Sequence, residues 1–339
     1  MNYQLIIPVI IVVIVLLCWL LYQRLTRTPF GKTKLRVALI FKFLDLVNSE
    51  KNRTVQKMRS GTDFNAKITQ GKRRKMEKII EVDIPVDGAS IKARIYYPVN
   101  KDNLPLIVFY HGGGWVVCGL HTHDALCRYL AYKTGFAVMS VDYRLAPENK
   151  YPVAMNDSYA ALKWAADNGH SMGFDTSRIS VCGDSAGGNM AAVMSLKAKE
   201  NAYPVLKCQA LIYPAVDLAH TDTESYNNFS KGYGLTLSEM EYFREQYLHD
   251  ESEWKNPDVS PLFAAGHSGL PPAIVITAGF DVLRDEGENY ASVLKHAGVE
   301  VKLKRYEMMF HGFICTGGIF KEAWQASDEV AEFIVQKNK

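Results

Sequence analysis

The clearest indication of the fold comes from residues 179–188, which read Ile179-Ser180-Val181-Cys182-Gly183-Asp184-Ser185-Ala186-Gly187-Gly188. The first four residues form a short, mostly apolar run typical of a strand, and a helical pattern continues from residue 186 to residue 200. Between them lies the pattern Gly-x-Ser-x-Gly. Glycines allow the close backbone approach of a sharp strand-to-helix turn, and such a turn exposes the central serine hydroxyl. The stretch therefore predicts a serine nucleophile at the edge of an α/β sheet.

Similar short apolar or β-branched runs lie on both sides of this turn. We predict strands at about 79–86, 89–97, 104–110, 136–141, 178–182, 208–213, 273–279 and 299–306. Helical patterns separate several of them, at 123–133, 153–168, 186–200, 284–297 and 321–336. This alternation predicts a mostly parallel sheet, with antiparallel pairing of the first two runs because no helix separates them.

The composition is that of an ordinary globular protein. The chain has 339 residues, of which 48% are hydrophobic and 22% charged, and these values exclude a disordered or collagen-like chain. A net charge of +3 gives no indication of nucleic-acid binding, so no nucleic-acid partner is predicted. The six cysteines form no Cys-x-x-Cys pair, and no Cys/His cluster has zinc spacing, so no metal is predicted.

A second motif, His111-Gly112-Gly113-Gly114-Trp115, follows the strand predicted at 104–110. Consecutive glycines leave backbone N–H groups unshielded, and such groups can bind the oxyanion that acyl transfer creates. We interpret His111 as an organiser of this loop, because the residue that begins the glycine run is poorly placed to serve Ser185.

With these motifs the chain resembles the hormone-sensitive-lipase-like branch of the α/β-hydrolases, which includes arylacetamide-deacetylase-like carboxylesterases. The matching segments are HGGGW at 111–115, DYRLAPE at 142–148, GDSAGG at 183–188, DVLRDEG at 281–287 and HGF at 311–313. Val282 departs from the family, which usually has proline after the acid. The resemblance implies an α/β-hydrolase fold with an eight-stranded, mostly parallel sheet, a helical cap built from N-terminal and inserted segments, and no cofactor.

A serine nucleophile needs a base, and the base needs an acidic partner that fixes its tautomer. This fold uses the chain order serine, acid, histidine. His311 is the candidate base, since among the later histidines it alone follows a late strand and precedes a small residue. Asp281, after the strand at 273–279, is the favoured acid. Asp217, after the strand at 208–213, is the alternative.

These residues predict a mechanism and a substrate class. Ser185 would attack an ester carbonyl while His311 takes its proton, and the N–H groups of Gly112, Gly113 and Ala186 would bind the oxyanion. Trp115 would wall the acyl pocket or pack as a core aromatic. We expect a serine carboxylesterase of lipid metabolism that hydrolyses short- to medium-chain acyl esters of small molecules. The alternatives are an amidase or deacetylase with the same triad, and a non-catalytic ligand-binding member of the fold. The oligomeric state is left open.

The charges divide the chain into three segments. Residues 1–23 carry no charged side chain, residues 24–78 carry a net charge of +12, and residues 79–339 therefore carry −9. The uncharged run at 5–22 would span roughly 27 Å as a helix, so we predict an N-terminal transmembrane anchor at 1–23. Residues 24–78 would be a basic juxtamembrane segment and part of the cap, with a helix at 34–47. Residues 79–339 would be the catalytic domain, with a cap insertion at about 218–256 that carries a helix at 238–249.

This division also predicts a localisation. No Lys or Arg precedes the apolar run, whereas Arg24, Arg27 and Lys32 follow it, which orients the C-terminal flank inward. We expect membrane lipid to be a partner, through residues 5–22 and the basic segment 24–78. The catalytic domain would be cytoplasmic. The lumenal face of the endoplasmic reticulum is the alternative, because similar eukaryotic enzymes are anchored there.

Overall fold

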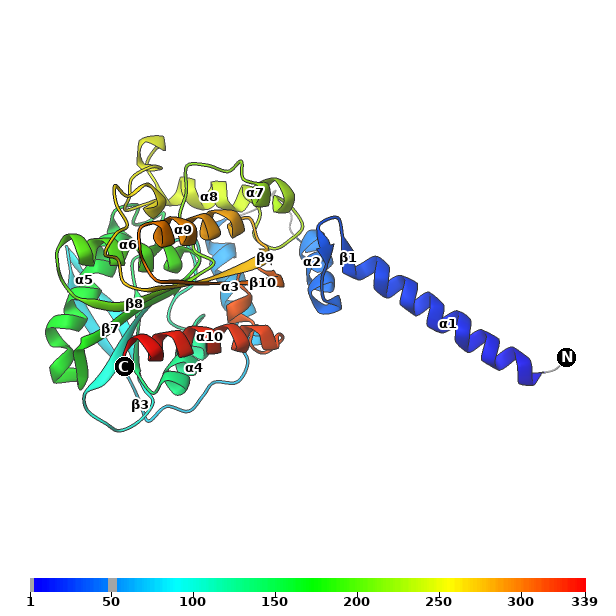
Figure 1. Ribbon diagram of the computed structural model, residues 1–339, viewed down its shortest axis with the longest axis horizontal. Coiled ribbons are helices and arrows are strands. Elements are labelled where there is room, and N and C mark those ends of the chain that lie inside the picture. The colour runs from blue at the N-terminus through cyan, green and yellow to red at the C-terminus, as the bar shows by residue number, and fades with distance from the viewer. Residues whose placement is uncertain (1–2, 48–53) are drawn as a thin grey trace.

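The computed structural model of the protein describes residues 3–47 and 54–339 and is built around one eight-stranded sheet (Figure 1). The strand order is β10-β9-β8-β7-β5-β6-β4-β3. The strands are β3 (Lys78–Val86), β4 (Ala89–Tyr97), β5 (Leu104–Tyr110), β6 (Ala137–Asp142), β7 (Phe174–Asp184), β8 (Leu206–Ile212), β9 (Ala273–Phe280) and β10 (Val301–Phe310). Two short strands, β1 (Arg27–Thr28) and β2 (Gly31–Lys32), form a separate antiparallel pair.

The pairing agrees with the predicted topology. β3 pairs antiparallel with β4 and β4 antiparallel with β6, whereas the other neighbours in the large sheet are parallel. All residues of β5 and β9 are buried, as expected for strands covered on both faces. The prediction of an eight-stranded, mostly parallel sheet is confirmed.

Helices cover both faces of the sheet (Figure 1). On one face, α4 (Asp124–Thr134) packs against α10 (Lys321–Lys337). On the other, α5 (Val153–Asn168) contacts α6 (Ala186–Glu200), and α9 (Arg284–His296) lies against β9. Because parallel strands end at the same edge of a sheet, the loops after β5, β7, β9 and β10 meet there. These are the loops that carry the predicted site.

Three further helices lie near that edge. α3 (Val55–Thr69) comes from the N-terminal part of the chain, while α7 (Glu224–Phe229) and α8 (Leu237–Tyr247) come from the stretch between β8 and β9. α8 was predicted at 238–249, but α3 and α7 were not predicted. α3 is a mostly polar, basic helix in which Ala66 is the one buried residue, so few apolar residues mark it in the sequence. Thr54 caps the N-terminus of α3, and its side-chain oxygen accepts a hydrogen bond from the N–H of Lys57.

α2 (Leu35–Val47) matches the helix predicted at 34–47. Its Phe41 side chain is buried and lies edge-on to three other rings, those of Tyr233, Phe280 and Phe310. α2 therefore packs where the ends of β9 and β10 meet the chain between α7 and α8.

The predicted membrane anchor is not supported. α1 (Tyr3–Thr26) covers the uncharged run, but among the described residues no helix is both long and apolar enough to cross a membrane. The predicted single-pass anchor at residues 5–22, and the membrane localisation built on it, are therefore wrong. The prediction relied on the length and the uncharged, apolar composition of the run. Residues 1–2 and 48–53 of the two N-terminal segments lie outside the described residues.

Candidate active site

Ser185 occupies a strained turn between β7 and α6. Its backbone angles are φ 56° and ψ −122°, a combination that a residue with a side chain adopts only where the surroundings enforce it. Two glycines make the turn possible. A Cβ on Gly187 would lie 2.0 Å from the carbonyl oxygen of Tyr110, and one on Gly183 would lie 2.1 Å from the carbonyl oxygen of Gly187. The Gly-x-Ser-x-Gly pattern is thus required by the close approach of α6 to β5 and β7.

The structure brings the three predicted residues Ser185, His311 and Asp281 together. Nε2 of His311 lies 2.8 Å from Oγ of Ser185, and Nδ1 of the same ring lies 2.8 Å from Oδ2 of Asp281. Asp281 is 1% exposed, and its Oδ1 accepts the backbone N–H of Leu283 at 2.9 Å. A buried carboxylate with both oxygens engaged holds the imidazole in one orientation and can stabilise its charged form.

Asp217, the alternative acid, is engaged elsewhere. Its Oδ1 accepts the backbone N–H groups of Ala219 and His220, and its Oδ2 lies 2.9 Å from Nδ1 of His220. This carboxylate therefore closes its own turn after β8, and the structure pairs His311 with Asp281.

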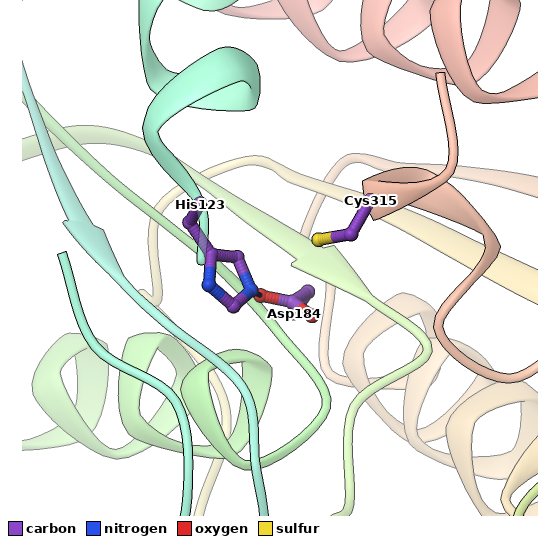
Figure 2. Close-up of side chains that lie close together, drawn as sticks. All are labelled: His123, Asp184 and Cys315. Atoms are coloured by element: carbon purple, nitrogen blue, oxygen red, sulfur yellow. Dashed lines mark ion pairs between the residues drawn. The ribbon is translucent and has the colours of Figure 1, made fainter. Parts of the chain in front are cut away.

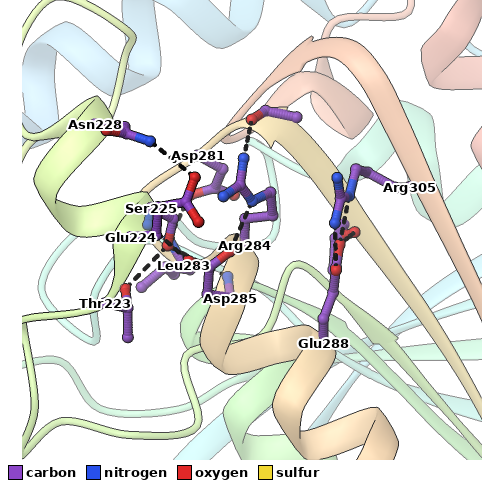
Figure 3. A network of polar contacts seen from close by, with 12 residues as sticks. Thr223, Glu224, Ser225, Asn228, Asp281, Leu283, Arg284, Asp285, Glu288 and Arg305 are labelled. Atoms are coloured by element: carbon purple, nitrogen blue, oxygen red, sulfur yellow. Dashed lines mark hydrogen bonds and ion pairs between the residues drawn. The ribbon is translucent and has the colours of Figure 1, made fainter. Parts of the chain in front are cut away.

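The loop that carries Asp281 is fixed by α7, as Figure 3 shows. The Ser225 hydroxyl donates to the carbonyl oxygen of Val282 at 2.7 Å, and the Ser225 N–H donates to Asp285 at 2.7 Å. Nε of Arg284 donates to Asp285 at 2.7 Å, and its guanidinium lies 5.1 Å from the ring of Phe229 in α7. These contacts connect the loop of Asp281 to α7, a helix that the sequence did not predict.

The glycine loop at residues 112–114 differs from the prediction at one backbone donor. The N–H of Gly112 donates to Oδ1 of Asp184 at 2.9 Å, so this group is already engaged. In the described part of the chain the N–H groups of Gly113 and Ala186 donate to no other group. Ala186 begins α6, where the first N–H groups have no partner within the helix. Two of the three predicted donors thus remain for an oxyanion.

His111 lies beneath this loop and is fully buried. Its ring stacks on Tyr143 with centroids 4.3 Å apart, and Nδ1 donates to the carbonyl oxygen of Gly112 at 2.7 Å. Burial, assisted by the neighbouring His123, lowers the pKa of His111 to about 3. The ring is therefore neutral near pH 7 and supports the glycine loop.

A cavity of about 230 Å³ opens beside Ser185 and His311. α3 contributes Thr62, Asn65, Ala66 and Thr69 to its wall, and the chain around α8 contributes Leu235, Met240 and Phe243. Trp115 lines the cavity as well, is 1% exposed, and stacks on Tyr247 with centroids 4.4 Å apart. The Trp115 side chain thus lies beside the cavity and also packs against a buried aromatic ring, which are the two positions predicted for it.

Comparisons with known proteins place the chain in a family. The family described as alpha/beta hydrolase fold matches residues 107–315. The chain is 43% identical to the carboxylic ester hydrolase LipN of Mycobacterium tuberculosis over 242 residues, which is 70% of this chain and 64% of LipN. It is 39% identical to an arylesterase of Saccharolobus solfataricus over 237 residues, 69% of this chain and 76% of the arylesterase.

Solved structures show the same fold. The esterase of Pyrobaculum calidifontis superposes with a TM-score of 0.82 at 40% identity, covering 88% of this chain and 97% of the esterase. The carboxylesterase EstE1, cloned from a metagenomic library, also gives a TM-score of 0.82 at 40% identity, with 85% and 98% covered. The chain belongs to the hormone-sensitive-lipase-like branch of the α/β-hydrolase family, as the motifs predicted, and it is a serine hydrolase.

Proposed function

We propose that the protein is a carboxylesterase in which Ser185 is the nucleophile, His311 the base and Asp281 its acidic partner. The observation that carries the proposal is the continuous chain of two 2.8 Å contacts, from Asp281 through His311 to Ser185, beside a cavity. The printed names of the relatives, a carboxylic ester hydrolase, an arylesterase and carboxylesterases, support ester hydrolysis.

The reaction follows from this geometry. Nε2 of His311 takes the hydroxyl proton of Ser185 as the oxygen attacks the ester carbonyl, and Asp281 stabilises the imidazolium that forms. The N–H groups of Gly113 and Ala186 donate to the oxyanion, while Gly112 holds the loop through Asp184. His311 then protonates the leaving alcohol, and a water molecule activated by the same histidine releases the acid and restores Ser185.

The cavity favours short- to medium-chain acyl groups. Its volume of about 230 Å³ is below the roughly 300–1,000 Å³ of common small-molecule pockets, and apolar side chains such as Met240 and Phe243 form part of its wall. We further propose that residues 79–339 form the catalytic domain, and that residues 24–78 and the insertion at about 218–256 together form the cap. The contribution of both segments to the cavity wall supports this division.

The test is a series of initial rates with esters of increasing acyl length, measured on the full chain. Soluble butyrate-type esters should be cleaved faster than emulsified long-chain triglycerides. Ser185→Ala should abolish hydrolysis while the fold is retained. Faster cleavage of the long-chain emulsion would refute the substrate class, and faster cleavage of a matched amide than of the ester would favour an amidase.

A further inference from the structure

Three side chains that can ligate a metal line this cavity and lie close together, as Figure 2 shows: His123, Asp184 and Cys315. They come from separate elements, since His123 precedes α4, Asp184 ends β7 and Cys315 ends η5 (Phe313–Cys315). One potential ligand atom from each residue lies within 4.8 Å of the other two. His123 and Asp184 are 3% and 4% exposed, and Cys315 is partly buried.

The His123 ring is held in place through Nδ1. The Thr122 hydroxyl lies 2.8 Å from the carbonyl oxygen of Gly119 and 2.9 Å from Nδ1 of His123. A neutral imidazole nitrogen is the form in which histidine binds metals.

The other ring nitrogen, Nε2, pairs with Asp184. It lies 3.0 Å from Oδ1, at ion-pair distance, although within the described residues its hydrogen-bond geometry is not aligned. Two ligand atoms of a tetrahedral zinc ion with bonds of about 2.1 Å lie about 3.4 Å apart. The His123–Asp184 separation is thus close to that of two ligands sharing a cation. The Cys315 sulfur would need to move by little more than about 1 Å to complete the set.

We propose that His123, Asp184 and Cys315 form a zinc site whose occupation inhibits hydrolysis. Imidazole, carboxylate and thiolate are the ligands that zinc prefers, and the two anionic ligands neutralise the ion in a buried position. The Cys315 thiol releases its proton to solvent when the sulfur–zinc bond forms. All three residues line the cavity, so water can take the fourth position.

The inhibitory effect, which depends on the proposed esterase function, follows from the contacts of Asp184. Its Oδ1 atom accepts the N–H of Gly112, which holds the glycine loop, and Asp184 directly precedes Ser185. Zinc bound to Oδ1 would compete with this hydrogen bond and displace the loop that carries the Gly113 donor. The active site would then lose oxyanion stabilisation while its triad remained in place.

Binding is tested without reference to hydrolysis by adding Co²⁺, a spectroscopic substitute for zinc, to the full chain. We expect a near-ultraviolet thiolate-to-cobalt charge-transfer band that Zn²⁺ displaces. Cys315→Ala should lose the band, and Cys118→Ala should keep it, because Cys118 lines the same cavity outside the cluster. In the unmodified chain, Zn²⁺ should protect Cys315 from alkylation. Absence of the band, its retention in Cys315→Ala, or unprotected Cys315 would each overturn the site.

Inhibition is tested with a butyrate-type ester in the presence of Zn²⁺. Zinc should inhibit the wild-type chain, a chelator should restore activity, and Cys315→Ala should need roughly tenfold more zinc or above for the same inhibition. Equal zinc sensitivity in Cys315→Ala would contradict the proposal and indicate binding at His311 and Asp281 instead. Full activity in a wild-type sample that shows the metal-binding signature would refute the inhibitory role. A chain that binds cobalt but never hydrolyses esters would refute the proposed function alone.

Discussion

Replacing Asp281 by Asn should nearly abolish catalysis while leaving the fold intact. The Asp281 carboxylate uses Oδ2 for His311 and Oδ1 for the N–H of Leu283. An asparagine that keeps its carbonyl oxygen on Leu283 must place its NH₂ group against Nδ1 of His311. The ring proton then moves to Nε2, and His311 can no longer accept the proton of Ser185.

The reverse amide orientation is also unfavourable. It would place the NH₂ group against the N–H of Leu283, donor against donor, in a position that is 1% exposed. Leaving a buried donor unsatisfied costs about 1–3 kcal/mol. The first orientation therefore dominates, and a wrong tautomer lowers kcat by about 10⁴-fold, or about 5.4 kcal/mol of transition-state stabilisation.

The assay is kcat for a soluble butyrate-type ester, with thermal unfolding as the check on folding. The matched control is Asp217→Asn, which removes a carboxylate at the end of the neighbouring strand without touching His311. That variant should keep most of the wild-type kcat. A kcat for Asp281→Asn within about tenfold of wild type, or a larger loss in Asp217→Asn, would refute the assignment of the acid.

Two further predictions concern packing and pH. Gly187→Ala should lower the melting temperature and abolish activity, because its Cβ would lie 2.0 Å from the backbone oxygen of Tyr110. Gly61→Ala, where the added Cβ meets nothing within 4 Å, should do neither, and equal melting temperatures for the two variants would contradict the argument. Burial raises the pKa of Glu286 well above its usual value, so its contribution to stability is present below about pH 4.5 and is lost as the pH rises. Between about pH 5 and pH 8 the free energy of unfolding, measured by urea titration, should therefore fall more in wild type than in Glu286→Gln. Parallel pH dependences of the two proteins would show that the Glu286 carboxyl does not titrate in this way.

The sequence predicted the sheet well because its strands carry a strong local signal. Leu104–Tyr110 and Ala273–Phe280 are buried on both faces, so they appear as short continuous apolar runs with clear ends. The glycines around Ser185 were equally informative, since the approach of the Tyr110 backbone leaves no room for a Cβ. The order of motifs then indicated His311 and Asp281 before their contacts were known.

Features that depend on distant contacts were not predictable in the same way. α3 is largely polar and is held by its ends and by Arg59, which donates to Glu148 and to two backbone carbonyls. The engagement of the Gly112 N–H depends on where the Asp184 side chain points, and no local pattern records that.

Two other outcomes show the limits of spacing and composition. His123, Asp184 and Cys315 are far apart in the sequence, so a search for zinc spacing could not find them. The N-terminal run illustrates the opposite error, since the length and the uncharged, apolar composition of the run were taken as evidence for a membrane span.

The central claim is that Ser185 is the nucleophile of an esterase, and covalent labelling tests it most directly. The full chain is treated with a fluorophosphonate, the labelled residue is identified by peptide mass spectrometry, and butyrate-ester hydrolysis is measured in parallel. We expect one label per chain, on Ser185, with activity lost in proportion to labelling and no label on Ser185→Ala. Labelling at another residue, or full hydrolysis by a completely labelled chain, would contradict the proposed mechanism.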